Sequence, residues 1–232
     1  MAGFVESPTT EALAKLARTK RIPFVEDLGS GAVVATERLG EIEHEPTPNE
    51  ALKSGVDLVC FSGDKLFGGP QAGIIAGKRR HIAALKSEPF FRALRCDKLI
   101  LTALQTTVDH YLAGKSSELP AHAMLEIGTD ELRARAEALL AQIRDLPLRG
   151  TIGEGKAHVG GGSLPRAVIP SVTLDLLPEK ISLDDFAARL RRGSTPVVGY
   201  IADGEFKLDL RTIFPRQDAQ LLSALRSAAQ WS

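Results

Sequence analysis

The sequence is poor in the residues and runs that mark several classes of protein. Only two of its 232 residues are cysteines, Cys60 and Cys96, and they have neither C-x-x-C spacing nor the density of a disulfide scaffold. No run of about 18 apolar residues is present, and no basic segment leads into an apolar one at the N-terminus. We therefore expect a cytoplasmic protein without a membrane-spanning helix or a signal peptide.

An excess of charge of one sign is also missing. The 29 lysines and arginines balance 29 aspartates and glutamates, so no overall field favours nucleic acid or an anionic membrane surface. Binding of tRNA would require a local basic patch. His81, His110, His122 and His158 show no metal-ligand spacing, so no metal is expected.

What is present is enough apolar sequence for a substantial core. Hydrophobic residues make up 44% of the chain, which at this length favours one domain plus a smaller second one. In the first half, Ser7-Pro8 predicts the start of a helix with Leu13, Leu16 and Ala17 on its inner face, and the strand 22–26 follows. This αβ unit lacks its opening strand, which suggests a domain that begins partway through.

The alternation of helices and strands continues after this unit. Thr47–Glu50 has capping-box spacing and predicts a short helix before the apolar strand 56–61. A further strand is expected at 73–77. Such alternation favours an α/β fold with a mostly parallel sheet and right-handed crossovers.

Two helices are predicted after these strands. Residues 78–86 place Ile82 and Leu85 at spacings suited to an inward face. Residues 98–113 carry leucines and valine at mixed spacings of two to four, which predicts a long helix that buries more than one face.

The stretch 113–120, rich in glycine, serine and proline, is the best domain boundary. We therefore assign residues 1–117 to part of a larger domain and residues 118–232 to a smaller α+β domain. The elements expected in the second are a helix at 129–144, a loop with six glycines at 150–162, a strand at 168–176, a helix starting at 182–185, a hairpin of 196–201 with 206–211, and a closing amphipathic helix at 221–228.

Lys65 is the most informative residue. It follows a predicted apolar strand and lies in a turn between Gly63 and the glycine-rich segment 68–73. Lysine becomes a nucleophile when burial or neighbouring charge favours its neutral form, so we predict a Schiff base to pyridoxal 5′-phosphate. From residue types alone, however, a structural or solvated lysine is the more frequent outcome.

Such a cofactor also needs a carboxylate for its pyridine nitrogen and donors for its phosphate. Asp27, predicted to follow a strand, is the candidate for the nitrogen, although a turn or cap role is the commoner one for such an aspartate. The Ser62 hydroxyl and the amides near Gly63 are candidates for the phosphate, and Gln71 for orienting cofactor or substrate oxygens. The glycines fit neither a Walker loop nor a dinucleotide fingerprint.

Several segments together closely resemble bacterial selenocysteine synthase, L-seryl-tRNA(Sec) selenium transferase. The resemblance spans nearly the whole chain, and the lysine segment is its most specific part. The segments are Glu26–Gly31, His44–Thr47, Phe61–Gly73, Arg92–Lys98, Val159–Pro165 and Leu208–Thr212.

This resemblance implies the aspartate-aminotransferase-like fold of fold type I pyridoxal phosphate enzymes. It also implies conversion of seryl-tRNA(Sec) to selenocysteinyl-tRNA(Sec), with selenophosphate as the selenium donor. In that mechanism the seryl amine displaces Lys65, the α-proton and hydroxide leave to give an aminoacrylyl intermediate, and selenium adds to it. The released Lys65 is the natural proton carrier.

The resemblance further implies roles for three charged residues near the lysine. Arg92 and Arg95 match arginines that hold the phosphate-like donor, and Asp64 matches an acidic residue beside the cofactor lysine. The guanidinium fork suits phosphate oxygens, and residues three apart share a helical face, although a solvated basic face is the alternative. Arg211, expected on the second hairpin strand, is a candidate for a substrate carboxylate or carbonyl, or else a half-exposed strand arginine.

Full-length relatives are expected to be longer, with a tRNA-binding N-terminal region and the first half of the cofactor domain. The chain would then hold only part of a cofactor site. Two alternatives stay open: a related lyase or transferase acting on a small amino acid or amino sugar, and an inactive module for association. A homo-oligomer is expected, because half a sheet leaves an unpaired edge and apolar surface.

Overall fold

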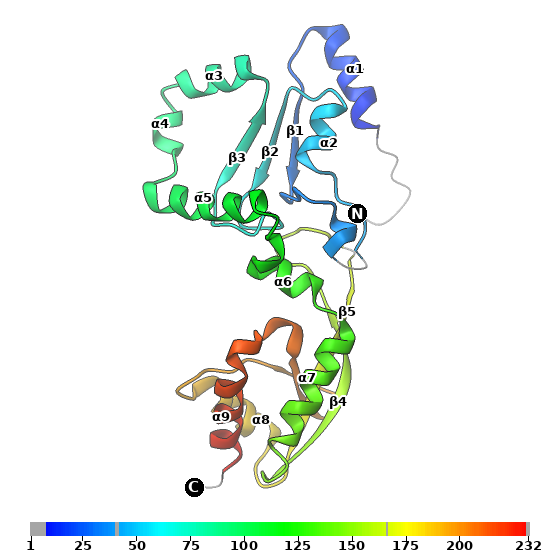
Figure 1. The fold of residues 1–232 in the computed structure, drawn as a ribbon, viewed down its shortest axis with the longest axis vertical. Coiled ribbons are helices and arrows are strands. Elements are labelled where there is room, and N and C mark those ends of the chain that lie inside the picture. The colour runs from blue at the N-terminus through cyan, green and yellow to red at the C-terminus, as the bar shows by residue number, and fades with distance from the viewer. Residues whose placement is uncertain (1–7, 40–41, 166, 231–232) are drawn as a thin grey trace. The chain divides into compact units, whose positions relative to one another are not determined.

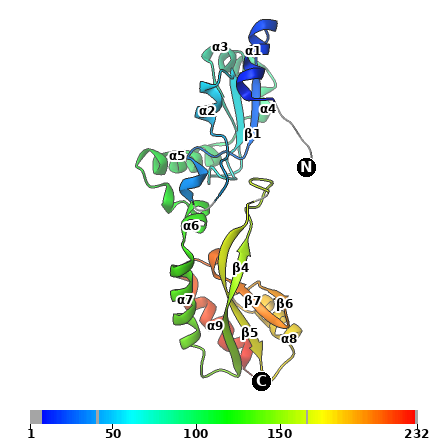
Figure 2. The same cartoon turned by 90° about the vertical axis from the view of Figure 1, so that its right-hand side faces the viewer.

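The computed structural model describes residues 8–39, 42–165 and 167–230 (Figures 1 and 2). The chain divides into two compact units, of which the first comprises residues 1–123 and 159–167 and the second comprises 124–158 and 168–232. The sequence placed a domain boundary after residue 117 and assigned 159–167 to the C-terminal domain. Contacts within the chain assign that short segment to the first unit instead.

The first unit is built on a three-stranded sheet in the order β1-β2-β3. Strands β1 and β2 pair in parallel, whereas β2 and β3 pair antiparallel. Figure 1 shows α3 and α4 beyond the β3 edge of this sheet, α5 running across its lower end, and α1 on the side of β1. Its elements are α1 (Thr10–Lys20), β1 (Val25–Gly29), η1 (Thr36–Leu39), α2 (Pro48–Lys53), β2 (Leu58–Ser62), β3 (Gly73–Gly77), α3 (Arg79–Ser87), α4 (Phe91–Leu94), α5 (Lys98–Leu112) and η2 (Ser116–Glu118).

The sheet was predicted to be mostly parallel. This holds for the β1–β2 pair, but β3 runs antiparallel to β2. The segment between β2 and β3, residues 63–72, holds the lysine turn and no helix. A parallel crossover needs a dozen or more residues, usually with a helix, so this short connection returns the chain antiparallel to β2.

Most helix positions were predicted well, but the buried faces of three helices were not. Helix α1 begins at Thr10 with Thr9 as its N-cap, and Ser7, the predicted start, lies outside the described residues. The capping box of Thr47 with Glu50 is confirmed at the start of α2. In α1 the small Ala14 and Ala17 are buried, while the larger Leu13 and Leu16 are 37% and 54% exposed. The inward face was therefore wrong for both leucines, whereas Ala17, predicted on the same face, is buried.

Helices α3 and α5 depart from prediction in the same direction. No residue of α3 is buried, and Leu85 is exposed. In α5 only Thr107 is buried, so the helix does not bury more than one face. Large apolar side chains stay on the surface of this region, and the most exposed of them are Phe90, Leu94, Leu99, Leu101 and Leu112.

Helix α6 (Pro120–Glu126) spans the junction between the two units. Beyond it, the second unit is an antiparallel four-stranded sheet in the order β4-β5-β7-β6 with three helices, which confirms the α+β pattern. Its elements are α7 (Thr129–Ala141), β4 (Leu148–Ala157), β5 (Ile169–Pro178), α8 (Leu183–Arg192), β6 (Tyr200–Ala202), β7 (Glu205–Asp209), η3 (Leu210–Thr212), η4 (Pro215–Gln217) and α9 (Asp218–Ala229).

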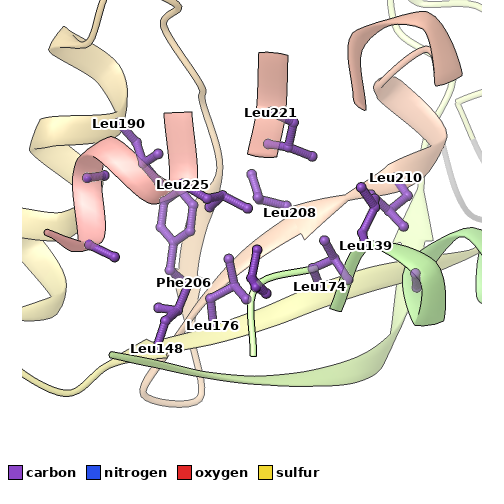
Figure 3. Close-up of a cluster of buried hydrophobic side chains, with 14 of the residues drawn as sticks. Leu139, Leu148, Leu174, Leu176, Leu190, Phe206, Leu208, Leu210, Leu221 and Leu225 are labelled. Atoms are coloured by element: carbon purple, nitrogen blue, oxygen red, sulfur yellow. The ribbon is translucent and has the colours of Figure 1, made fainter. Parts of the chain in front are cut away.

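The core of the second unit lies between its sheet and its helices. Phe206 of β7 is fully buried and meets Phe186 of α8 edge to face, with 5.6 Å between ring centroids. Figure 3 shows leucines of β4, β5, β7 and the helices converging around Phe206. Leu221, Leu225 and Ala228 line the buried side of α9, as its amphipathic pattern predicted.

Most of the predicted glycine loop 150–162 is strand. Residues 148–157 form β4, which pairs along its whole length with β5. Glycine suits these positions because an added side chain would displace a neighbouring one: a Cβ on Gly150 would lie 2.5 Å from Leu140 Cδ2, and one on Gly153 would lie 2.2 Å from Asp175 Oδ2. Glycine therefore marks close packing in this strand rather than a loop.

Within the described ranges, no helix has the length and apolar character needed to cross a membrane. The same residues contain no group of three or more His, Cys, Asp or Glu side chains placed to hold a metal ion.

Asp57, just before β2, links the residue before β1 to the residue after β3 in the first unit. Its carboxylate accepts a hydrogen bond from the Phe24 amide at 2.8 Å and another from the Lys78 ammonium at 2.6 Å. The Asp57 side chain is only 11% exposed. The hydrogen bond from Lys78, followed by that from the Phe24 amide, lowers the pKa of Asp57.

We therefore predict that Asp57 stabilises the fold above the unfolded-state pKa of about 3.9, and that this stabilisation disappears as the pH falls through the lower folded-state pKa. Asp57→Asn should cost about 1–3 kcal/mol at neutral pH and should flatten the acid limb of stability against pH. Urea unfolding from neutral to acid pH measures both effects. Asp109→Asn, on the exposed surface of α5, is the control, and an equal loss in both variants would contradict the prediction.

Candidate functional site

The turn that carries Lys65 is closed by backbone hydrogen bonds. The Gly63 amide donates to Ala72 O at 2.8 Å, the Gly69 amide to Gly63 O at 2.8 Å, and the Gly68 amide to Lys65 O at 2.9 Å. A Cβ on Gly63 would lie 2.7 Å from Pro70 O, so this close approach requires glycine. The turn therefore presents Lys65 from a backbone with little freedom.

Lys65 and Asp27 approach the same glycine. Lys65 Nζ and Asp27 Oδ1 each lie 4.0 Å from the point where a Cβ on Gly29 would stand. The turn is also fastened to this segment, because the Leu66 amide donates to Ser30 O at 2.9 Å. The structure thus brings together the predicted amine and the predicted carboxylate.

Asp27 does not follow its strand as expected but lies inside β1, which extends to Gly29. Its side chain is exposed, and Oδ1 accepts the Gly29 amide at 3.1 Å in a local turn. Pairing between β1 and β2 shifts in register between Asp27 and Gly29. Such a register shift changes the direction of the side chains next to it, and this one lies close to the lysine turn.

A segment distant in sequence, around Gly161, also lies beside the Lys65 side chain. Gly161 has a φ of +69°, and the Lys65 side-chain carbons Cγ, Cδ and Cε lie 3.7, 4.0 and 4.0 Å from the position of a Cβ on it. Ser163 in the same segment and Ser30 beside β1 are buried, and neither hydroxyl has a hydrogen-bond partner among the described residues. Two segments that adjoin Lys65 thus each carry a buried hydroxyl without a partner among the described residues.

The remaining predicted residues of the lysine segment surround this turn. Ser62 is half-buried at the end of β2, and Asp64 and Gln71 are exposed on either side of Lys65 along the chain. The Gly63 amide itself donates to Ala72 O, so the use of amides near Gly63 for phosphate stays a prediction for the neighbouring residues. Ser62 itself stays a predicted ligand of phosphate.

Arg92 and Arg95 lie at the short helix α4 and are both exposed. Arg92 is inside the helix, whereas Arg95 is its C-cap with extended backbone angles, so they do not share a regular helical face. Within the described ranges neither guanidinium has an ion-pair or hydrogen-bond partner. Both therefore remain available to a solution anion, and the phosphate role stays a prediction.

Arg211 lies in η3, just after β7, and not on the hairpin strand. It is 6% exposed, and its Nη1 and Nη2 donate to the carbonyl oxygens of Met124, Leu125, Ile127 and Pro170. Burial lowers its pKa. Three of these carbonyls lie at the C-terminal end of α6 or just after it, so Nη1 and Nη2 have a structural role. Nε has no partner among the described residues, and the substrate role of Arg211 stays a prediction.

Sequence reasoning missed three residues that contact the lysine turn or the lysine itself. Gly161 belongs to a glycine run whose position beside Lys65 depends on the fold. Tyr111 and His122 donate hydrogen bonds to the turn from α5 and α6. Nothing in the sequence indicated that His122 would be a buried structural histidine.

The chain has part of the aspartate-aminotransferase-like fold, fold type I, of pyridoxal phosphate-dependent enzymes. A solved structure of D-glucosaminate-6-phosphate ammonia-lyase matches it with a TM-score of 0.57 at 21% sequence identity. The match covers 97% of this chain and 54% of that chain.

The family model for L-seryl-tRNA selenium transferase matches residues 1–214. The protein of that name from Carboxydothermus hydrogenoformans is 39% identical over 218 residues, covering 93% of this chain and 47% of the relative. The Geobacter sulfurreducens protein is 39% identical over 232 residues, covering 98% of this chain and 50% of the relative. The chain belongs to the L-seryl-tRNA selenium transferase family, and it spans about half the length of these relatives.

The contact between Gly161 and Lys65 generates a prediction with a built-in control. Gly161→Val should slow modification of Lys65 by an amine-reactive reagent several-fold, because the new side chain would press on the lysine stem. Gly162 has a similar positive φ of +75° but open space around it, so Gly162→Val introduces the same backbone strain without the contact. Mass spectrometry measures modification of Lys65 relative to exposed Lys15.

Slowing in Gly161→Val alone is the expected result. Equal rates in the two valine variants would mean that backbone strain, and not the contact, limits Lys65.

Proposed function

We propose that this chain provides the cofactor-lysine half of a selenocysteine synthase, which converts seryl-tRNA(Sec) to selenocysteinyl-tRNA(Sec) with selenophosphate as the donor. The main support for this proposal is that Lys65 Nζ and Asp27 Oδ1 both lie close to Gly29 in a chain that belongs to this family. Because the chain spans about half of its relatives, the activity of the whole protein is part of the proposal.

The residues at the lysine turn fit pyridoxal 5′-phosphate. Lys65 is half-buried and has no ion-pair partner among the described residues, so its amine is free to condense with an aldehyde. The exposed Asp27 carboxylate would receive the pyridine nitrogen, and Ser62 together with the unpaired Ser30 and Ser163 hydroxyls would supply donors. When bound, the cofactor supplies an electron sink for the carbon attached to the amino group.

The chain's own residues then have distinct tasks in our proposal. Lys65 Nζ would take the α-proton of the seryl group and return a proton to the departing hydroxyl group. Asp64 adds negative charge beside that amine, and Gln71 orients substrate oxygens from the exposed end of the turn. Arg92 and Arg95, exposed and unpaired in the described structure, hold the phosphate group of selenophosphate through their guanidinium forks.

Self-association is a further part of the proposal. Phe90, Leu94 and Leu99 are 70%, 67% and 74% exposed around α4 and the start of α5, next to the proposed phosphate-binding arginines. Clustered large apolar side chains on a surface favour burial against a partner, and a second copy of the chain is the partner that we propose. We propose the cytoplasm as the compartment, where Cys60 and Cys96 would stay free thiols as they are in the structure.

The amine of Lys65 should be the attachment point for the cofactor. Incubation with pyridoxal 5′-phosphate should give a saturable visible absorbance band, and borohydride reduction should place the pyridoxyl label on Lys65. Lys65→Arg should abolish the band, because arginine keeps the charge but cannot form the imine. Lys115→Arg is the control on an exposed lysine, and a band that survives in Lys65→Arg would refute the assignment.

The same material distinguishes the alternatives. A chain with no saturable Lys65-dependent band would fit an inactive association module. If the band forms, β-elimination from free serine without tRNA would favour the small-substrate lyase over the tRNA-linked enzyme.

The apolar surface at α4 and α5 gives a separate prediction. Light scattering should report an oligomer for the native chain and a smaller species for Leu94→Glu/Leu99→Glu, because buried charges oppose association. Val198→Glu, at a residue 77% exposed in the second unit, should leave the mass unchanged. A native chain that is monomeric at all accessible concentrations would contradict self-association through this surface.

A further inference from the structure

The two carbonyls that follow Lys65 are held by side chains from two helices. His122 Nε2 in α6 lies 2.8 Å from Leu66 O, and Tyr111 Oη in α5 donates to Phe67 O at 2.8 Å. The two side chains also meet, with 3.0 Å between Tyr111 Oη and His122 Nε2. His122 is fully buried, and Leu66 and Phe67 are 2% and 6% exposed, so water does not replace these bonds.

The proton positions in this cluster follow from its acceptors. Leu66 O can only accept, so Nε2 of His122 must carry the hydrogen. Tyr111 donates its proton to Phe67 O, and its oxygen can then accept a share of the His122 N–H. Burial raises the pKa of Tyr111, which keeps the phenol protonated as the donor. The Nδ1 atom of His122 has no partner among the described residues.

Packing reinforces these bonds along the same side of the turn. The Tyr111 ring stacks on Phe67 with 5.3 Å between centroids and meets His122 edge to face at 5.7 Å. A Cβ on Gly68 would stand 3.8 Å from His122 Cδ2 and 3.5 Å from Leu119 Cδ1. Three successive residues after Lys65 are thus contacted from α5 and α6.

We propose that His122 and Tyr111 are positioning residues that lock the lysine turn and so set where Lys65 presents its amine. The role in attachment of an aldehyde rests on the function proposed above, whereas the locking of the turn does not. Without these donors, two buried carbonyls would lose their partners, and the backbone would turn them toward water. Because Leu66 is the next residue, that movement would displace Lys65.

The first test uses the full chain without cofactor. Hydrogen exchange at the Gly68 and Gly69 amides, which close the turn onto Lys65 O and Gly63 O, should accelerate about tenfold or more in His122→Ala and Tyr111→Phe. His122→Gln should restore protection, because its side-chain amide N–H lies the same number of bonds from Cβ as the histidine Nε2–H. Leu119→Ala, which removes packing at Gly68 but no hydrogen bond, is the matched control.

The expected result is loss of protection in His122→Ala and Tyr111→Phe, recovery in His122→Gln, and a smaller effect in Leu119→Ala. Equal acceleration in Leu119→Ala and His122→Ala would overturn the proposal, because general loosening of the core would then explain both. Unchanged exchange in His122→Ala would overturn it as well.

The second test measures the rate at which pyridoxal 5′-phosphate becomes reducible onto Lys65, at a temperature where every variant is folded. His122→Ala and Tyr111→Phe should slow labelling about tenfold, and His122→Gln should recover most of the rate. If the native chain is not labelled at Lys65, the proposed function fails while exchange still decides whether the turn is locked. If labelling is normal in all variants, the positioning role is wrong and the proposed function stands.

Discussion

The lysine site depends on one constraint, the close approach of Gly63 to Pro70 and Ala72 at the other end of the turn. Its amide reaches Ala72 O and its carbonyl receives the Gly69 amide, so the chain leaves β2 and returns as β3 within ten residues. A side chain at Gly63 would meet Pro70 O at 2.7 Å. Glycine there permits a turn in which Lys65 is held by backbone bonds, without an ion pair among the described residues.

The parts of the site that could be read from the sequence are those that depend on local chemistry. Lys65 after an apolar strand, the glycines around it and the capping box at Thr47 each follow from short-range rules, and the structure contains them. Asp27 was found through its place near the end of a strand, although the strand runs past it to Gly29. The resemblance to a family supplied Arg92 and Arg95, whose role no contact in the described chain decides.

What sequence reasoning missed depends on residues that are distant along the chain. Gly153 looked like loop because glycine is rare in strands, yet Asp175 and Thr173 of the paired strand leave no room there for a Cβ. Leu13 and Leu16 looked like a core face, but the buried residues of that helix are Ala14 and Ala17. For Gly153 the deciding neighbours lie on another strand, so no local pattern records them.

The contacts around Lys65 also explain how an amine can be held firmly and still react. A carboxylate bonded to Nζ would favour the ammonium form, which is not a nucleophile. Here the restraints act on carbon and on the backbone: Gly161 lies against the lysine stem, and His122 and Tyr111 hold the carbonyls that follow. Asp27 approaches the same glycine without an ion pair to the amine. Placement of the amine thus rests on contacts to carbon and to the backbone, and not on an ion pair at Nζ among the described residues.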